Sequence, residues 1–252
     1  MRMMRTALWV GLFTMMIASL ASANPITMPA GLAPGSTYFL AFVTAGTRDA
    51  LPPSTISDYD AFVTAQADLS PDLLALRLAT GFTWKAIAST ATISAATHLG
   101  LITGPIYNLA GEFIASGSAD LFDGSISNPI NYDQYGLGCV ADGVNEYCTT
   151  WTGSDQFGNT NSGLGGSYPA TIGNSPAIDS SWILAGSNGE AKLNHLYAIL
   201  DPTTPLTVPA AAVPEPGTIS LLMGPGLILF GRGLRRRRRL ATRTKTSDPA
   251  VH

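Results

Sequence analysis

Charged side chains are segregated along this chain, and the segregation limits what can fold together. Residues 24–212 contain four basic side chains against fifteen acidic ones, a net charge of −11. Residues 232–252 contain eight basic side chains against one acidic one, a net charge of +7. Such a split predicts two compartments rather than one folded surface. It also argues against nucleic acid as a partner, since the large acidic segment has no basic patch.

The first 23 residues have the parts of a secretory signal peptide. Two arginines near the start precede an apolar run at residues 7–20, which we expect to form a short signal helix. Small residues follow at Ala21 and Ala23, the two positions that a signal peptidase reads. Fourteen apolar residues are too few to span a bilayer comfortably. We therefore expect signal peptidase to cut after Ala23 and to leave Asn24 as the amino terminus of an exported chain.

The carboxyl-terminal part begins as a proline-rich segment and ends in arginines. We expect residues 201–212 to form an extended linker, because proline fixes φ and removes a backbone donor. Residues 217–231 carry no charge. As a helix these fifteen residues would reach about 22 Å, which is short of a hydrocarbon core of about 30 Å. The basic side chains that follow are Arg232, Arg235, Arg236, Arg237, Arg238 and Arg239.

The arginines resist transfer across the membrane and so act as a stop-transfer signal. The sequence therefore predicts a single short transmembrane helix that anchors the chain transiently at the inner membrane. Residues 241–252 would form a basic cytoplasmic tail. This anchor is too short to be a strong one.

A four-residue motif directly precedes the apolar segment: Val213, Pro214, Glu215 and Pro216. With the apolar segment and the arginines, it resembles the PEP-CTERM sorting signal of Gram-negative bacteria over residues 213–240. The resemblance implies processing by an exosortase, a membrane-embedded cysteine transpeptidase-like enzyme that would cut near the motif. The domain would then be released or transferred to the cell surface. The alternative is a membrane-tethered periplasmic protein.

Between the two terminal signals, residues 24–200 predict one compact α+β domain. The apolar patterns predict strands at residues 37–44 and 82–89, and a hairpin at residues 106–114. Helices are expected at residues 57–68, from Pro71 onward, and as a turn at residues 93–98. Short apolar pieces predict further strands in the second half, at residues 130–132, 149–152, 181–184 and 193–200. We expect a mostly antiparallel sheet, few short helices and long loops.

Six short segments of this domain carry a second resemblance. They are residues 39–49, 84–92, 105–111, 120–125, 151–153 and 181–182. They look like a bacterial extracellular domain that is distantly similar to the C-type-lectin-like fold of collagen-derived endostatin. This resemblance implies a twisted, mostly antiparallel sheet. Sugar-binding lectins of that fold use Glu-Pro-Asn or Gln-Pro-Asp for calcium and sugar, and neither tripeptide occurs in this sequence.

The only two cysteines are Cys139 and Cys148. In an exported chain they predict a disulfide rather than a metal site. His98 and His195 are expected to have structural roles, because no nucleophile elbow or zinc-binding helix motif is present.

Three tryptophans lie in strand-like apolar segments: Trp84, Trp151 and Trp182. We expect them in the core rather than on an exposed sugar-binding platform.

One loop is rich in side-chain oxygen. Asp155, Asn159 and Asn161 are calcium candidates, although the same residue types are favoured in ordinary turns. We expect no metal and no cofactor.

The sequence thus lacks a catalytic set. We expect a non-enzymatic protein of the cell surface or extracellular matrix. Proteins with the PEP-CTERM signal commonly accompany genes for exopolysaccharide production, which implies a role in biofilm and exopolysaccharide as a partner. One alternative is an extracellular carbohydrate-active hydrolase that draws a carboxylate pair from Glu112, Asp120 and Asp123. Another is a calcium-dependent glycan-binding module.

Overall fold

The computed structural model describes residues 26–139, 148–166 and 169–210. The chain divides into two units at Val208, and the folded domain belongs to the first unit. The predicted signal cleavage site at residues 21–24, the motif at residues 213–216 and the arginines of residues 232–239 lie outside the described residues. Within the described residues, no helix combines the length and the apolar character that a membrane span requires.

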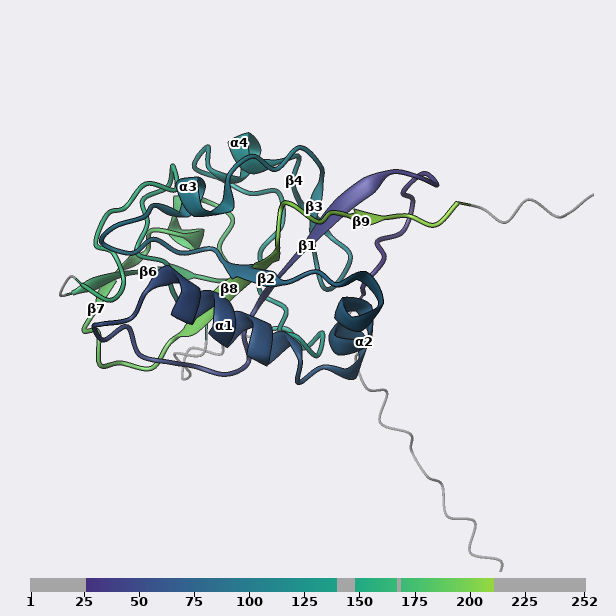
Figure 1. Ribbon diagram of the computed structural model, residues 1–252. Coiled ribbons are helices and arrows are strands. Elements are labelled where there is room, and N and C mark those ends of the chain that lie inside the picture. Colours follow the sequence, from purple (N-terminus) through teal and green to yellow (C-terminus); the bar gives the residue numbers. More distant parts are fainter. Residues whose placement is uncertain (1–25, 140–147, 167–168, 211–252) are drawn as a thin grey trace, which may run out of the picture. The chain divides into compact units, whose positions relative to one another are not determined.

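A mixed β-sheet forms the centre of the domain (Figure 1). Within the described ranges it has nine strands, in the spatial order β4-β3-β1-β8-β5-β6-β7, with β2 beside β8 and β9 beside β1. The strands are β1 (Thr37–Val43), β2 (Trp84–Ala86), β3 (Ile106–Asn108), β4 (Phe113–Ala115), β5 (Thr149–Trp151), β6 (Ala170–Asn174), β7 (Gly186–Asn188), β8 (His195–Leu200) and β9 (Leu206–Thr207). The β1–β3 and β5–β8 pairs are parallel, and the other described pairs are antiparallel. The expected α+β class with a mostly antiparallel sheet is confirmed.

The two central strands are buried because their sequences are continuous apolar runs. Every residue of β8 and every residue of β1 except Thr37 is buried. Across the sheet Phe42 lies opposite Ala198, and Trp84 lies opposite Leu200. Strands that are covered on both faces have this continuous apolar pattern instead of an alternating one.

Helix α1 (Ile56–Ala67) lies alongside the free edge of β2 (Figure 1). The backbone N–H of Ala86 donates to the carboxylate of Asp60 over 2.8 Å. The carbonyl of Trp84 accepts from the hydroxyl of Thr64 over 3.2 Å. Side chains of α1 thus occupy backbone groups that an edge strand would otherwise present to other chains.

The remaining helices are short. They are α2 (Pro71–Thr80), α3 (Ala95–Leu99), α4 (Ser118–Leu121) and the 3₁₀ turn η1 (Ser180–Trp182). As expected, α2 begins at a proline, which is favoured in the first turn. It ends at Thr80 and is capped by Gly81, whose φ of 75° is in the left-handed region that glycine adopts readily.

Several expected elements differ from those observed. The strand expected at residues 82–89 is confined to β2, and residues 130–132 contribute only a bridge between Tyr132 and Gly138. Residues 181–184 were expected in a strand, but η1 covers their start. The reason is local, because the Asp179 carboxylate accepts from the backbone N–H of Ser181 over 3.0 Å and caps the turn.

Strand β9 lies within the segment that was expected to be a linker. It pairs with the first residues of β1, and the backbone N–H of Val208 then donates to the carbonyl of Ser36 over 2.9 Å. Leu206 and Val208 are buried. The folded domain therefore continues to Val208, past the expected boundary at residue 200, because these apolar side chains complete the core beside β1.

The segment from Trp151 to Gly153 shows why one glycine is needed. Gly153 has a φ of +61°, and a Cβ at this position would collide with the carbonyl oxygen of Ser89. Trp151 and its neighbour Thr152 are fully buried. Glycine is required at residue 153 because the chain passes too close to the Ser89 carbonyl for any side chain.

Candidate functional site

Among the described residues, titratable side chains line two hollows of the domain. The first, which we call the α1 groove, has a volume of about 510 Å³ and is lined by residues of α1 and β2 and by Asp68, Thr83 and Asp201. The second, the His195 pocket, has a volume of about 190 Å³ and lies where β1 ends and β8 begins. Both have an aspartate and a histidine in or next to their walls, so both are candidates for chemistry.

Two carboxylates of the α1 groove are engaged by neighbouring side chains. Asp60 Oδ1 lies 2.9 Å from His98 Nε2 and also accepts from the Ala86 backbone. Asp68 binds the guanidinium of Arg77 through two contacts of 2.7 Å. These contacts join α1 to α3, β2 and α2, and they support the structural role expected for His98.

The third carboxylate of the groove, Asp201, is also occupied. It accepts from the backbone N–H of Thr203 over 3.0 Å and lies 3.6 Å from the ammonium of Lys85. Asp60 lies in α1 and Asp68 directly follows its last residue, eight positions further on, which corresponds to an axial rise of about 12 Å. That is wider than the separation of the carboxylate pairs in glycosidases, about 5–9.5 Å. The carboxylates of the α1 groove therefore serve contacts between elements of the fold.

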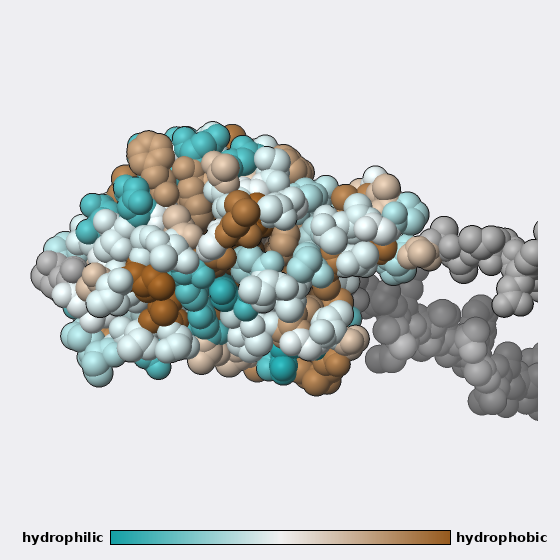
Figure 2. Space-filling model, turned by 45° about the horizontal axis from the view of Figure 1, so that its top comes forward, coloured by the Kyte–Doolittle hydropathy of each residue, from teal (hydrophilic) through white to brown (hydrophobic). Residues whose placement is uncertain are grey.

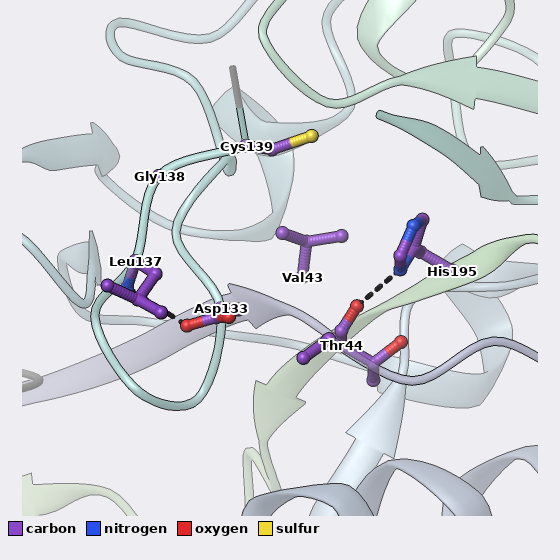
Figure 3. Close-up of a pocket in the computed structure, with 8 residues that line it drawn as sticks. Val43, Thr44, Asp133, Leu137, Gly138, Cys139 and His195 are labelled. Atoms are coloured by element: carbon purple, nitrogen blue, oxygen red, sulfur yellow. Dashed lines mark hydrogen bonds between the residues drawn. The ribbon is translucent and has the colours of Figure 1, made fainter. Parts of the chain in front are cut away.

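Figure 3 shows the His195 pocket, in which Val43 lies between Asp133 on one side and His195 on the other. Its walls come from the end of β1, the start of β8 and the loop that precedes Cys139. The lining residues are Val43, Thr44, Ala45, Asp133, Leu137, Gly138, Cys139 and His195.

His195 is held by the backbone. Its Nδ1 lies 2.6 Å from the carbonyl oxygen of Thr44 (Figure 3). Because a carbonyl can only accept, Nδ1 carries the hydrogen. Burial lowers the pKa of His195, against the opposing effects of the Thr44 and Gly46 backbone groups and of the Asp133 carboxylate. The neutral ring is thereby favoured, and its Nε2 then has a lone pair that can accept a hydrogen bond.

Asp133 is held by its own turn. One carboxylate oxygen accepts from the backbone N–H groups of Tyr135 at 2.8 Å and Leu137 at 2.9 Å. Burial raises the pKa of Asp133, and these two hydrogen bonds oppose that effect. The turn orients the carboxylate, so its position does not depend on His195.

Two glutamines fix the backbone at the floor of the pocket. The N–H of Ala45 donates to Gln134 Oε1, and the N–H of Gly46 donates to Gln66 Oε1, each over 2.8 Å. The amide of Gln134 in turn donates to Gln66 Oε1 over 3.3 Å. This network holds the end of β1 in place, so the polar groups of the pocket are preorganised.

The predicted disulfide between Cys139 and Cys148 is present. Cys139 lines the pocket, and Cys148 directly precedes β5. Strand β5 pairs with the start of β8, where Thr150 lies opposite His195. The disulfide thus ties one wall of the pocket to the strand next to His195.

The three tryptophans are core residues, with exposures of 1% for Trp84 and 0% for Trp151 and Trp182. The core prediction is confirmed, and these side chains do not form an exposed platform. The indole N–H of Trp151 donates to the carbonyl of Arg48 over 2.9 Å.

The calcium candidates form an ordinary turn. Asp155 Oδ1 accepts from the backbone N–H groups of Phe157 and Asn159, at 2.9 and 2.8 Å. The Asn161 amide lies 3.3 Å from the hydroxyl of Thr171. In the described part of the chain, no group of three or more His, Cys, Asp or Glu side chains is placed to hold a metal ion.

The three acids considered for hydrolysis each accept a hydrogen bond from a residue two to four positions away. They are Glu112, Asp120 and Asp123. None of them lines the α1 groove or the His195 pocket. The structure instead draws attention to Asp133, Gln66 and Gln134, which no sequence motif marked. Their roles depend on contacts between segments that are far apart in the chain.

The fold and the pocket define a class of protein: a disulfide-containing α+β domain with a small, preorganised pocket. A scan against protein-family models gave no match, and no curated protein is significantly similar in sequence.

Proposed function

We propose that this chain is an exported protein that an exosortase sorts to the cell surface or the extracellular matrix. There it acts without catalysis and in association with exopolysaccharide. The observation that carries this proposal is the order of the motif at residues 213–216, the apolar segment and the arginines, behind an amino-terminal signal peptide. The disulfide supports export, because disulfides persist in oxidising compartments.

We infer a C-type-lectin-like architecture for the domain. A mixed, mostly antiparallel sheet with short helices and long loops supports this inference. The absence of the calcium-binding tripeptides from the sequence supports a function that does not depend on calcium.

The position of β9 supports cleavage at the motif, because the cut would fall outside the folded domain. Val208, the last residue of the first unit, precedes the motif by five residues. A cut at residues 213–216 would therefore remove the apolar segment and the arginines and leave every strand of the described domain intact.

The test compares the C-terminal ends of the mature protein in cells with and without the exosortase. In wild-type cells we expect surface material that lacks residues 232–239. The triple variant Pro214→Ala, Glu215→Ala, Pro216→Ala should keep these residues and stay with the membrane fraction. Mass spectrometry of the C-terminal peptides measures both.

The matched control is the double variant Pro205→Ala, Pro209→Ala, which changes prolines of the same segment but leaves the motif intact. It should be processed like the wild type. An arginine tail on mature surface material, or normal processing of the triple variant, would contradict the proposal.

A further inference from the structure

We propose that the His195 pocket binds a single neutral sugar unit of a polysaccharide through the sugar's hydroxyl groups. The proposal deepens the proposed function and rests on it for the source of the polysaccharide. It does not depend on calcium.

The size of the pocket sets the size of the ligand. A volume of about 190 Å³ is the share of roughly six water molecules at about 30 Å³ each. It is smaller than the sites for drug-sized ligands, which are about 300–1,000 Å³. One sugar ring is a ligand of suitable size, whereas a longer stretch of polymer would have to lie outside the pocket.

The polar groups of the pocket are acceptors, so they favour a ligand that donates hydrogen bonds. His195 uses Nδ1–H on the Thr44 carbonyl, which leaves Nε2 as an acceptor. Asp133 offers carboxylate oxygens and already accepts from two backbone N–H groups. A neutral sugar supplies hydroxyl donors to both residues. A sugar with its own carboxylate would meet repulsion from Asp133 in a domain that is already strongly acidic.

The apolar part of the lining suits the C–H face of a sugar ring. Val43 lies between the two polar residues (Figure 3), and Leu137 lines the pocket with 54% of its surface exposed. Apolar walls with a few well-placed polar groups are typical of small-molecule sites. The glutamine network and the disulfide already hold the walls of the pocket. Binding would therefore lose little conformational entropy of the protein.

The pocket and strand β9 lie at opposite ends of β1. Strand β9 pairs with Thr37 and Tyr38 at the start of β1, whereas Val43 and Thr44 at its end line the pocket. Six residues of strand separate Thr37 from Val43, which is roughly 20 Å. The pocket is therefore separated along β1 from β9, the last strand of the domain.

Other surfaces of the domain are weaker candidates for a ligand site. The α1 groove is explained by its internal contacts. On the face shown in Figure 2, hydrophobic residues form small patches separated by hydrophilic ones, and scattered apolar residues of this kind are normal on protein surfaces.

The experiment uses the full chain, purified in mild detergent, and measures binding of methyl glycosides of glucose, galactose and mannose by calorimetry. Glucuronic acid is the anionic comparison. We expect at least one neutral glycoside to bind and glucuronic acid to bind more weakly. Added EDTA should leave the affinity unchanged.

Two variants remove one acceptor atom each, Nε2 of His195 and the second carboxylate oxygen of Asp133, and keep the local backbone contacts. In His195→Asn the amide can still donate to the Thr44 carbonyl, and in Asp133→Asn the amide oxygen can still accept from the turn. Each should weaken binding by about tenfold, the effect of one lost hydrogen bond of about 1.4 kcal/mol. The control Asp60→Asn, in the α1 groove, should bind like the wild type.

Urea denaturation checks that all three variants fold. The proposal is overturned if no neutral glycoside binds, if glucuronic acid binds best, or if folded His195→Asn and Asp133→Asn bind like the wild type. None of these outcomes affects processing at residues 213–216, so the sorting proposal is judged separately by its own assay.

Discussion

Two aspartate–histidine neighbourhoods occur in the same domain, and they are built differently. Beside the α1 groove, Asp60 and His98 contact each other at 2.9 Å. In the His195 pocket, the aspartate and the histidine are each held by backbone groups, Asp133 by Tyr135 and Leu137, and His195 by Thr44. The Asp60 and His98 side chains hydrogen-bond to each other. In the His195 pocket, His195 Nε2 and the Asp133 carboxylate can still accept hydrogen bonds from a ligand.

The comparison distinguishes a pair that serves packing from a pair whose geometry would suit a ligand. When a carboxylate and an imidazole bind each other, their joint effect is to fasten the elements that carry them. When the backbone orients each group separately, their positions are fixed and their remaining lone pairs stay available. We therefore expect changes at Asp60 to alter stability, and changes at Asp133 or His195 to alter binding.

Removal of the disulfide should have the largest effect on stability. The double variant Cys139→Ala, Cys148→Ala opens a loop with a sequence separation of 9. The chain-entropy model gives a loss of about 2–3 kcal/mol in the free energy of unfolding. Urea denaturation with and without reductant measures it, and the wild type under reductant should match the double variant. Because Cys139 lines the His195 pocket, binding of the neutral glycoside should weaken as well. Unchanged binding would show that the pocket does not need this wall.

Asp60→Ala should destabilise the domain by about 2 kcal/mol, because the Ala86 N–H and His98 both lose their acceptor. Asp60→Asn is the matched variant, since its amide oxygen can replace one of these contacts, and it should cost less. Urea denaturation compares the two with the exposed control Asp72→Ala. If Asp60→Ala were as stable as that control, the pair would not have the structural role described above.

The smallest expected effect is a pH dependence at His195. Burial lowers its pKa in the folded state below the ordinary value of 6.5. Below about pH 6.5 the unfolded chain therefore binds a proton that the folded chain does not, and the stability decreases as pH falls. The difference in unfolding free energy between wild type and His195→Asn should fall between about pH 7 and pH 5. A flat difference would mean that His195 is not desolvated.

The sequence was most informative where one segment alone sets the pattern. The apolar runs of β1 and β8, the helical spacing of α1 and the proline that begins α2 were all predicted close to their observed positions. The disulfide and the buried tryptophans were also predicted, because a single pair of cysteines and tryptophans within apolar segments leave few alternatives.

The sequence was less informative for short, polar strands. Strand β7 (Gly186–Asn188) has no apolar residue, and β9 lies among prolines, so neither has a pattern that marks it as a strand. Both form because a neighbouring strand offers backbone partners, β6 for β7 and β1 for β9. Pairing of this kind depends on the rest of the sheet.

By itself, then, the amino-acid order determined the α+β class, the buried central strands and the cysteine pair, since each depends on side chains within one short window. The tertiary structure alone decided which aspartate stands near which histidine, and whether the two contact each other. Asp60 and His98 are 38 residues apart, and the Thr44 carbonyl that orients His195 is 151 residues away from it. Contacts over such separations follow from the packing of the whole sheet, and no local pattern of residues encodes them.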